Sequence, residues 1–145
     1  MNILPVGLNI TGKKIVIIGG GKIALQKMKA LSQFTKKIKV VALNIGDEIK
    51  KSRCTYQEKA YEPDDLNGAF LVYACTDQKC LNSRIKCDAG KRGILVNAAD
   101  NRKQCDFISP AVYKKGYMTV AVLSNGRNIK KSVAWRDAIR KLFEK

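Results

Sequence analysis

The fold is decided by the stretch Lys14-Ile15-Val16-Ile17-Ile18-Gly19-Gly20-Gly21-Lys22-Ile23-Ala24. Residues 14–18 form an apolar, β-branched run, which is typical of a central parallel strand buried on both faces. Three glycines follow, and from Lys22 to about Phe34 the apolar residues recur at helical spacing. The sequence therefore predicts a strand, a glycine turn and a helix, in this order.

The glycine turn has the pattern Gly19-x-Gly21-x-x-Ala24, in the strand-to-helix context that gives this motif its meaning. Gly19 permits the tight turn, Gly21 lets the backbone approach a pyrophosphate, and Ala24 allows close packing of helix and strand. The helix N-terminus offers N–H donors and partial positive charge to phosphates. We expect a Rossmann-type unit that binds a nicotinamide dinucleotide; the alternative is a glycine-rich turn without a ligand.

The remainder of this first part alternates between strands and helices. The sequence predicts strands at 38–42, 55–59, 70–74 and 94–98, a turn at 62–65 and a helix from about 78 to 89. This alternation favours a parallel α/β sheet with helices on both faces. Alternating apolar residues from Leu4 to Ile10 also predict a short extended segment before the first strand.

The pattern changes after Pro110. A strand is expected at 118–123, followed by a helix with an apolar stripe made of Trp135, Ala138, Ile139, Leu142 and Phe143. We expect residues 1–112 to form an NAD-binding Rossmann domain and residues 113–145 to form a small strand–helix segment that joins two subunits in a homodimer. Packing of the helix on the chain's own sheet is the alternative.

The composition of the chain limits the classes of function that it can have. The chain has 145 residues, a net charge of +16, no histidine and five cysteines without a C-x-x-C pair. We expect a soluble, cytoplasmic protein with free thiols, no metal site and no membrane segment. The charge favours a polyanionic partner, but no nucleic-acid-binding motif is visible. Without histidine, proton transfer falls to a carboxylate, Lys, Tyr, Cys or water.

The spacing of residues after the second strand does not decide between NAD and NADP. The acidic residue that usually binds the adenosine ribose should end the second strand, but Ala42-Leu43-Asn44 stands there and the next acid is Asp47. Asn44 can bond ribose hydroxyls, although it neither repels nor grips a 2′-phosphate. Lys22 places a cation beside the phosphates, which would tolerate NADP.

Several further motifs occur in order along the chain. They are Leu4-Pro5, Gly12-Lys13, residues 16–24, Ala74-Cys75-Thr76-Asp77 with Leu81-Asn82, Val96-Asn97-Ala98-Ala99-Asp100, Cys105-Asp106-Phe107-Ile108-Ser109-Pro110-Ala111 and Met118-Thr119-Val120-Ala121-Val122. With these motifs the chain resembles the precorrin-2 dehydrogenase family, the N-terminal dehydrogenase and ferrochelatase module of siroheme synthases.

The resemblance implies an activity and a set of site residues. NAD⁺ would remove a hydride from precorrin-2 to give sirohydrochlorin, and many members then insert Fe²⁺ as a substrate to give siroheme. Asp100 is the catalytic candidate, and Ser124 lies by the tetrapyrrole site, followed by Asn125, Arg127 and Lys130. The candidate cofactor-binding residues are Gly19, Gly21, Lys22, Ile23, Ala24, Leu43, Asn44, Thr76 and Asp77.

Three departures from the family pattern accompany the resemblance. Lys22 replaces the acidic residue that commonly follows the third glycine. The family's usual Gly-Gly-x-Ser-Pro appears here as Asn125-Gly126-Arg127-Asn128-Ile129, and the chain stops at Lys145, before the family's C-terminal helical domain. Two other functions stay open: a member that mainly performs chelation, and a non-catalytic Rossmann module that senses NAD or uses its basic face to bind nucleic acid.

Overall fold

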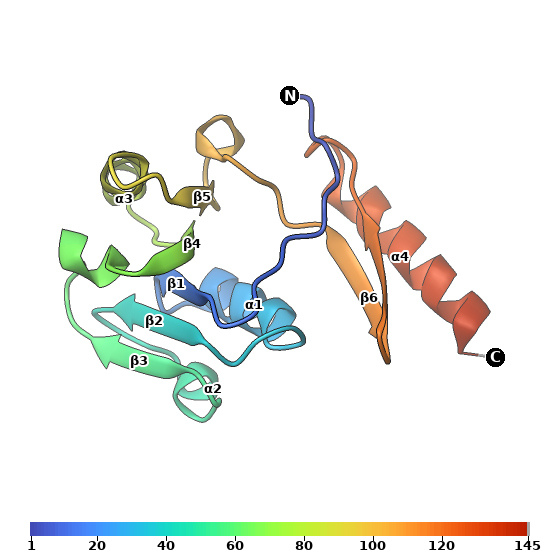
Figure 1. Ribbon diagram of the computed structural model, residues 1–145, viewed down its shortest axis with the longest axis horizontal. Helices are drawn as coiled ribbons and strands as arrows, with labels where there is room; N and C mark the ends of the chain where they lie inside the picture. Colours follow the sequence, from blue (N-terminus) through green and yellow to red (C-terminus); the bar gives the residue numbers. More distant parts are fainter. Residues whose placement is uncertain (145) are drawn as a thin grey trace. The chain divides into compact units, whose positions relative to one another are not determined.

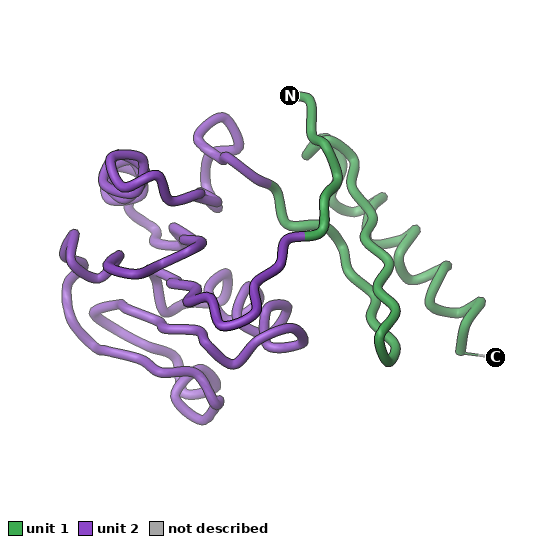
Figure 2. The backbone as a smooth tube through the Cα atoms, viewed as in Figure 1, with its two compact units in different colours: residues 1–7, 108–145 green, residues 8–107 purple. Residues whose placement is uncertain are grey.

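The computed structural model describes residues 1–144 and divides into two units (Figure 2). The first unit described, purple in Figure 2, contains residues 8–107. The second, green in Figure 2, contains residues 1–7 and the chain from Ile108 onward. The second unit begins before residue 113 because a strand, β6 (Ala111–Lys115), belongs to it.

The first unit is built on a five-stranded sheet in which all strands are parallel (Figure 1). Its strands are β1 (Lys14–Ile18), β2 (Ile38–Ala42), β3 (Thr55–Glu58), β4 (Ala69–Ala74) and β5 (Leu95–Ala98), in the order β3-β2-β1-β4-β5. The strand order reverses between β1 and β4, and open α/β sheets bind their ligands at such a point, outside the carboxyl ends of the strands. The predicted Rossmann-like fold is confirmed.

Helices cover both faces of this sheet, as the sequence predicted. In β1, Ile15 and Ile17 pack in one core cluster with α1 (Lys22–Leu31) and α2 (Asp47–Lys50). Val16 and Ile18 pack in the other, with the 3-10 helix η1 (Pro63–Leu66) and with α3 (Lys79–Gly90). Because neighbouring strand residues point to opposite faces, this one strand anchors both halves of the core.

One helix end in this unit was predicted wrongly, and one short helix was not foreseen. Helix α1 ends at Leu31, three residues early, where the Ser32 hydroxyl donates to the Met28 carbonyl at 2.7 Å. Residues 4–10, expected to be extended, belong to no strand pair, and Leu4 is 80% exposed. Alternating apolar residues favour a strand only where a partner strand supplies hydrogen bonds. The short helix α2 carries too few residues to give a periodic signal and was not foreseen.

The second unit contains an antiparallel strand pair and a helix, where a single strand and a helix were expected. β6 pairs with β7 (Met118–Val122) across the turn at Gly116, which has φ +59°. The 15-residue helix α4 (Ile129–Phe143) follows, and the Asn128 side chain accepts from Lys131 N–H at 2.9 Å at its start. β6 was not foreseen, because its exposed Lys114-Lys115 end has the composition of a loop.

Five large apolar side chains of this unit, termed its exposed apolar face, are each more than half exposed: Tyr117, Met118, Trp135, Leu142 and Phe143. The stripe that the sequence predicted along α4 is therefore largely uncovered within one chain. None of the helices within residues 1–144 combines the length and the apolar character needed to cross a bilayer.

Candidate functional site

The glycine turn joins the ends of three strands. Gly19 has φ +128°, and a Cβ there would lie 2.4 Å from the Cys75 carbonyl oxygen, directly after β4. A Cβ on Gly20 would lie 2.1 Å from the Asn44 carbonyl oxygen, just after β2. Both positions therefore require glycine, since backbone atoms cannot give way. The need at Gly20 was missed because it occupies a free position in the motif.

Gly21 differs from its two neighbours, because nothing lies within 4 Å of a Cβ built on it. It is the N-cap residue of α1, no side chain caps the helix, and no acidic residue stands in the first turn. The first N–H groups of α1 thus face open space with the positive end of the helix dipole behind them. This arrangement suits a pyrophosphate, so the residues present fit a dinucleotide cofactor.

The other residues expected around this turn divide into exposed and buried ones. Lys22, Ile23, Leu43 and Asn44 are exposed, whereas Ala24 is fully buried. Gly46 N–H donates to the Gly20 carbonyl at 3.0 Å and ties the segment after β2 to the turn. The structure therefore brings the candidates from the end of β2 next to the glycine turn.

After β4, the expected residues Thr76 and Asp77 have different surroundings. The Thr76 hydroxyl lies 2.7 Å from Oδ1 of the buried Asn82 on α3, and Asn82 Nδ2 donates to the Thr76 carbonyl at 3.0 Å. Through these hydrogen bonds the Thr76 side chain stabilises the start of α3. Asp77 is exposed at the same edge of the sheet.

Asp100 lies two residues beyond β5 and is exposed. Ala99 N–H donates to the Ala74 carbonyl at 2.9 Å, which fixes this loop beside the end of β4. Burial raises the pKa of the neighbouring Cys75 thiol to about 12; the Lys27 ammonium opposes this rise and the Asp100 carboxylate adds to it. Within residues 1–144, the Asp100 carboxylate has no hydrogen bond or ion pair.

Asp106 has a structural role. Its Oδ2 accepts from Val96 N–H at 2.9 Å, Asp106 N–H donates to the Val96 carbonyl at 2.8 Å, and Lys86 pairs with its other oxygen. The adjacent Cys105 thiol exchanges hydrogen bonds with the backbone of Ala98, both at 3.1 Å. These contacts hold the edge of β5, and they engage Asp106 but not Asp100.

The candidates Ser124, Asn125, Arg127 and Lys130 all lie in the second unit. The Ser124 hydroxyl accepts from Asn128 N–H and donates to the Asn128 carbonyl, both at 3.0 Å. Asn125 has φ +51°, a left-handed conformation that asparagine tolerates better than most residues. The loop thus forms a regular turn despite its departure from the family pattern. Arg127 and Lys130 are exposed.

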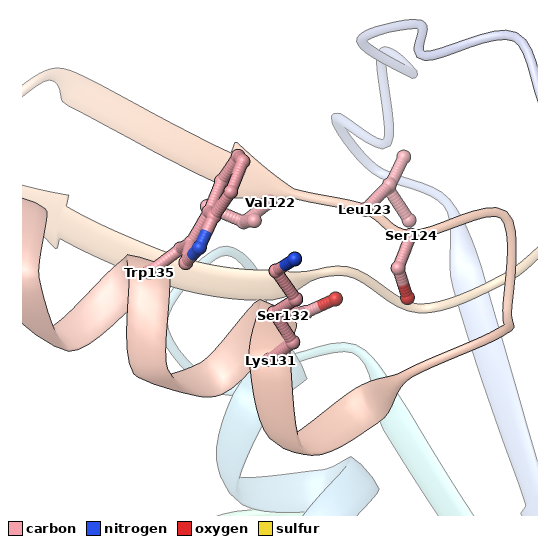
Figure 3. Close-up of a pocket in the computed structure, with 6 residues that line it drawn as sticks. All are labelled: Val122, Leu123, Ser124, Lys131, Ser132 and Trp135. Atoms are coloured by element: carbon pink, nitrogen blue, oxygen red, sulfur yellow. The ribbon is translucent and has the colours of Figure 1, made fainter.

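A pocket of about 230 Å³ opens beside Ser124 (Figure 3). Lys131, Ser132 and Trp135 extend into it from α4, opposite Val122 and Leu123 at the end of β7. Lys131 Nζ lies 5.7 Å from the centroid of a Trp135 ring. The pocket therefore combines an exposed aromatic face with a cation.

No metal centre is formed by the described part of the chain: within residues 1–144, no three Cys, Asp or Glu side chains gather closely enough to hold an ion. The five cysteines are free thiols, two of them exposed on α3.

Comparisons with known proteins agree with this geometry. A family model described as "Putative NAD(P)-binding" matches residues 6–111. A siroheme synthase of Nitrosococcus oceani is 34% identical over 130 residues, and a probable multifunctional siroheme biosynthesis protein HemA of Ruminiclostridium josui is 35% identical over 145. These alignments cover 87% and 95% of this chain, which spans only 28% of the length of each relative.

Among solved structures, the chain is similar to one described as SirC, a precorrin-2 dehydrogenase. The TM-score is 0.83 and the sequence identity 23%, over 94% of this chain and 69% of the other. At this identity the match supports the shared fold.

Proposed function

This chain belongs to the NAD(P)-binding family whose model it matches, and on that premise we propose that it oxidises precorrin-2 to sirohydrochlorin with NAD⁺ as the hydride acceptor. The names of its relatives support the reaction, because they are siroheme synthases and a precorrin-2 dehydrogenase. The net charge of +16 supports the substrate class, since precorrin-2 is a polycarboxylate.

The proposal depends mainly on the unpaired carboxylate of Asp100. This carboxylate lies at the carboxyl edge of the sheet, where the open glycine turn also lies. Ligands of open α/β sheets bind at this edge. A carboxylate is also one of the few proton acceptors that a chain without histidine offers.

The chain's own groups would share the work of the reaction. The backbone N–H groups at the start of α1 hold the pyrophosphate, and the exposed Leu43 and Asn44 border the adenosine end. When bound, the cofactor supplies a nicotinamide ring that accepts the hydride. An Asp100 carboxylate oxygen receives the proton that the substrate loses.

Asp100 is tested by anaerobic assay of the purified protein with precorrin-2 and saturating NAD⁺. Asp100→Ala and Asp100→Asn should lower kcat by about 10²- to 10⁴-fold, the usual contribution of a positioned acid–base group. NAD⁺ affinity should stay unchanged. Asp64→Ala is the matched control, because Asp64 is a carboxylate with an 87% exposed side chain on η1.

Two outcomes would refute parts of the proposal. Absence of sirohydrochlorin with the parent protein, together with tight NAD⁺ binding, would favour the non-catalytic NAD-sensing module. An Asp100→Ala variant with kcat within about threefold of the parent would fall well short of an acid–base contribution. Adding Fe²⁺ to the same reaction measures whether the protein inserts iron into sirohydrochlorin after the oxidation, and whether this chelation is faster than the oxidation.

The preference for NAD rests on the segment after β2. Residues 43–46, Leu43-Asn44-Ile45-Gly46, contain no cation that would grip a 2′-phosphate, and the exposed Asn44 can bond ribose hydroxyls. Parallel titrations with NAD⁺ and NADP⁺ test this preference. Tighter binding of NADP⁺ would assign the exposed Lys22 the role of phosphate ligand.

We further propose that two copies of the chain associate through the exposed apolar face of the second unit. Isolated apolar side chains on a surface are ordinary, but five large ones gathered on one strand pair and one helix mark an interaction site. Self-complementary association of such a patch produces a two-fold dimer.

The free thiols fit the reducing cytoplasm, where we expect the protein to act.

A further inference from the structure

Lys27 is a half-buried cation without a counter-ion. It lies on α1, and within residues 1–144 no carboxylate lies within 4.0 Å of its Nζ. The neighbouring lysine of the same helix, Lys29, has a 59% exposed side chain and pairs with Glu48 at 2.6 Å. Lys27 thus lacks the surface position and the partner that lysines usually have.

The surroundings of the Lys27 ammonium are largely apolar. Its Nζ lies 5.7 Å from the centroid of the buried Tyr73 ring on β4, and the Tyr73 ring in turn meets the Phe107 ring edge-on at 5.3 Å. Burial lowers the pKa of Lys27, against smaller opposing effects of the Cys75 and Cys105 thiols. An ammonium in such a place is costly unless an anion accompanies it.

The position of Lys27 points toward the candidate site. Lys27 follows the N-cap Gly21 by six residues, about 9 Å along a helix axis, and helical side chains lean back toward the N-terminus. Tyr73, whose ring faces Lys27 Nζ, lies just before Cys75 in the chain. Ala99, the neighbour of Asp100, donates its N–H to the Ala74 carbonyl at 2.9 Å. The charges of Lys27 and Asp100 both act on the Cys75 thiol. Cys75 also borders Gly19. Lys27 and Asp100 therefore lie near the same residue, beside the glycine turn.

We propose that the Lys27 ammonium binds one carboxylate of the tetrapyrrole substrate and so fixes that substrate beside Asp100. This inference rests on the proposed function. The substrate is the fitting source of the anion, because the cofactor's phosphates belong at the start of α1. The oxidised nicotinamide ring carries a positive charge, which an ammonium repels. Sequence analysis missed Lys27 because a lysine in a surface helix is usually solvated.

The test is titration of the protein with sirohydrochlorin, the tetrapyrrole product, by absorbance or fluorescence, with parallel titration by NAD⁺. Lys27→Gln should weaken sirohydrochlorin binding by about 10- to 100-fold, the effect of losing one charge-assisted hydrogen bond. Lys27→Arg should recover much of the affinity. Lys29→Gln removes an equal charge from the same helix and should change binding little. NAD⁺ affinity should be unaffected in all three variants.

Proton uptake provides a second readout that a purely structural lysine would not give. A carboxylate raises the lowered pKa of Lys27, so binding should draw a proton from solution at alkaline pH. Calorimetry in buffers of different ionisation enthalpy measures this uptake, which Lys27→Arg should abolish because arginine stays charged. The titratable groups facing Lys27 are the Cys75 and Cys105 thiols and the Tyr73 phenol. The pKa values of both thiols are raised, so they remain neutral near pH 8.

The outcomes separate this inference from the function on which it rests. A parent protein that binds no tetrapyrrole refutes the proposed function. A parent that binds it, with Lys27→Gln equal to Lys29→Gln, refutes the role of Lys27 alone. A Lys27→Gln variant that loses NAD⁺ affinity instead would assign the ammonium to the cofactor and overturn the inference. A lower Tm without any change in binding would make Lys27 a structural residue.

Discussion

The substitution Gly21→Asp should strengthen the fold slightly while it abolishes cofactor binding. Gly21 is the N-cap of α1 with φ −91° and ψ −162°, an extended conformation that any residue adopts, and a Cβ there meets nothing within 4 Å. Aspartate is among the best N-cap residues, worth a few tenths of a kcal/mol over glycine. Its charge at the helix N-terminus adds about 0.3–1 kcal/mol.

The same carboxylate occupies the place that the pyrophosphate needs. It would accept from the free N–H groups of the first turn and would lie within about 4 Å of the phosphate charges. At an effective dielectric constant of about 20, one such pair of like charges costs about 4 kcal/mol. This corresponds to a rise in the NAD⁺ dissociation constant of about 10³-fold at low ionic strength.

Titration calorimetry with NAD⁺ and thermal unfolding measure the two effects on the same sample. The uncharged Gly21→Asn, of equal size, should keep the stability and lose much less affinity, which separates charge from bulk. NAD⁺ binding within about threefold of the parent would remove the glycine turn as the cofactor site, since threefold is well under 1 kcal/mol. A marked fall in Tm would contradict the open space at Gly21.

Four other predictions concern packing, assembly, thiol reactivity and the pH dependence of stability. Gly20→Ala should destabilise the protein by at least about 1–3 kcal/mol in denaturant unfolding, because its Cβ would lie 2.1 Å from the Asn44 carbonyl oxygen, whereas Gly46→Ala, at 3.4 Å from the nearest atom, should be tolerated. Light scattering at micromolar concentration should give a dimer mass that Trp135→Asp reduces to a monomer, and a monomeric parent would count against the apolar face as an interface. At pH 8 the exposed Cys80 and Cys87 should react with iodoacetamide while Cys75, whose pKa burial raises to about 12, stays unmodified in peptides analysed by mass spectrometry. The same shift should lower stability as pH rises above 9, because the unfolded chain then loses the Cys75 proton and the native state keeps it.

The sequence alone was sufficient for the features that depend on neighbouring residues. The β-branched run before Gly19 and the helical spacing after Gly21 predicted the strand, turn and helix, and their repetition predicted a parallel sheet with helices on both faces. Such signals are local, because backbone preferences and apolar periodicity act within a few residues. The apolar stripe around Trp135 was also visible in the sequence. The sequence does not indicate, however, which surface covers this stripe.

Only the tertiary structure decided which residues meet. Gly20 needs glycine because Asn44, 24 positions later, brings its carbonyl oxygen against it. Residues 4–10 join no sheet because no partner strand lies beside them, whereas β6 formed because β7 supplied a partner. Lys27 has the sequence context of a solvated lysine, and it becomes an unpaired, half-buried cation only because Tyr73 on β4 and Cys75 just after it lie against Lys27. Contacts over such separations depend on the packing of whole elements, which no local pattern encodes.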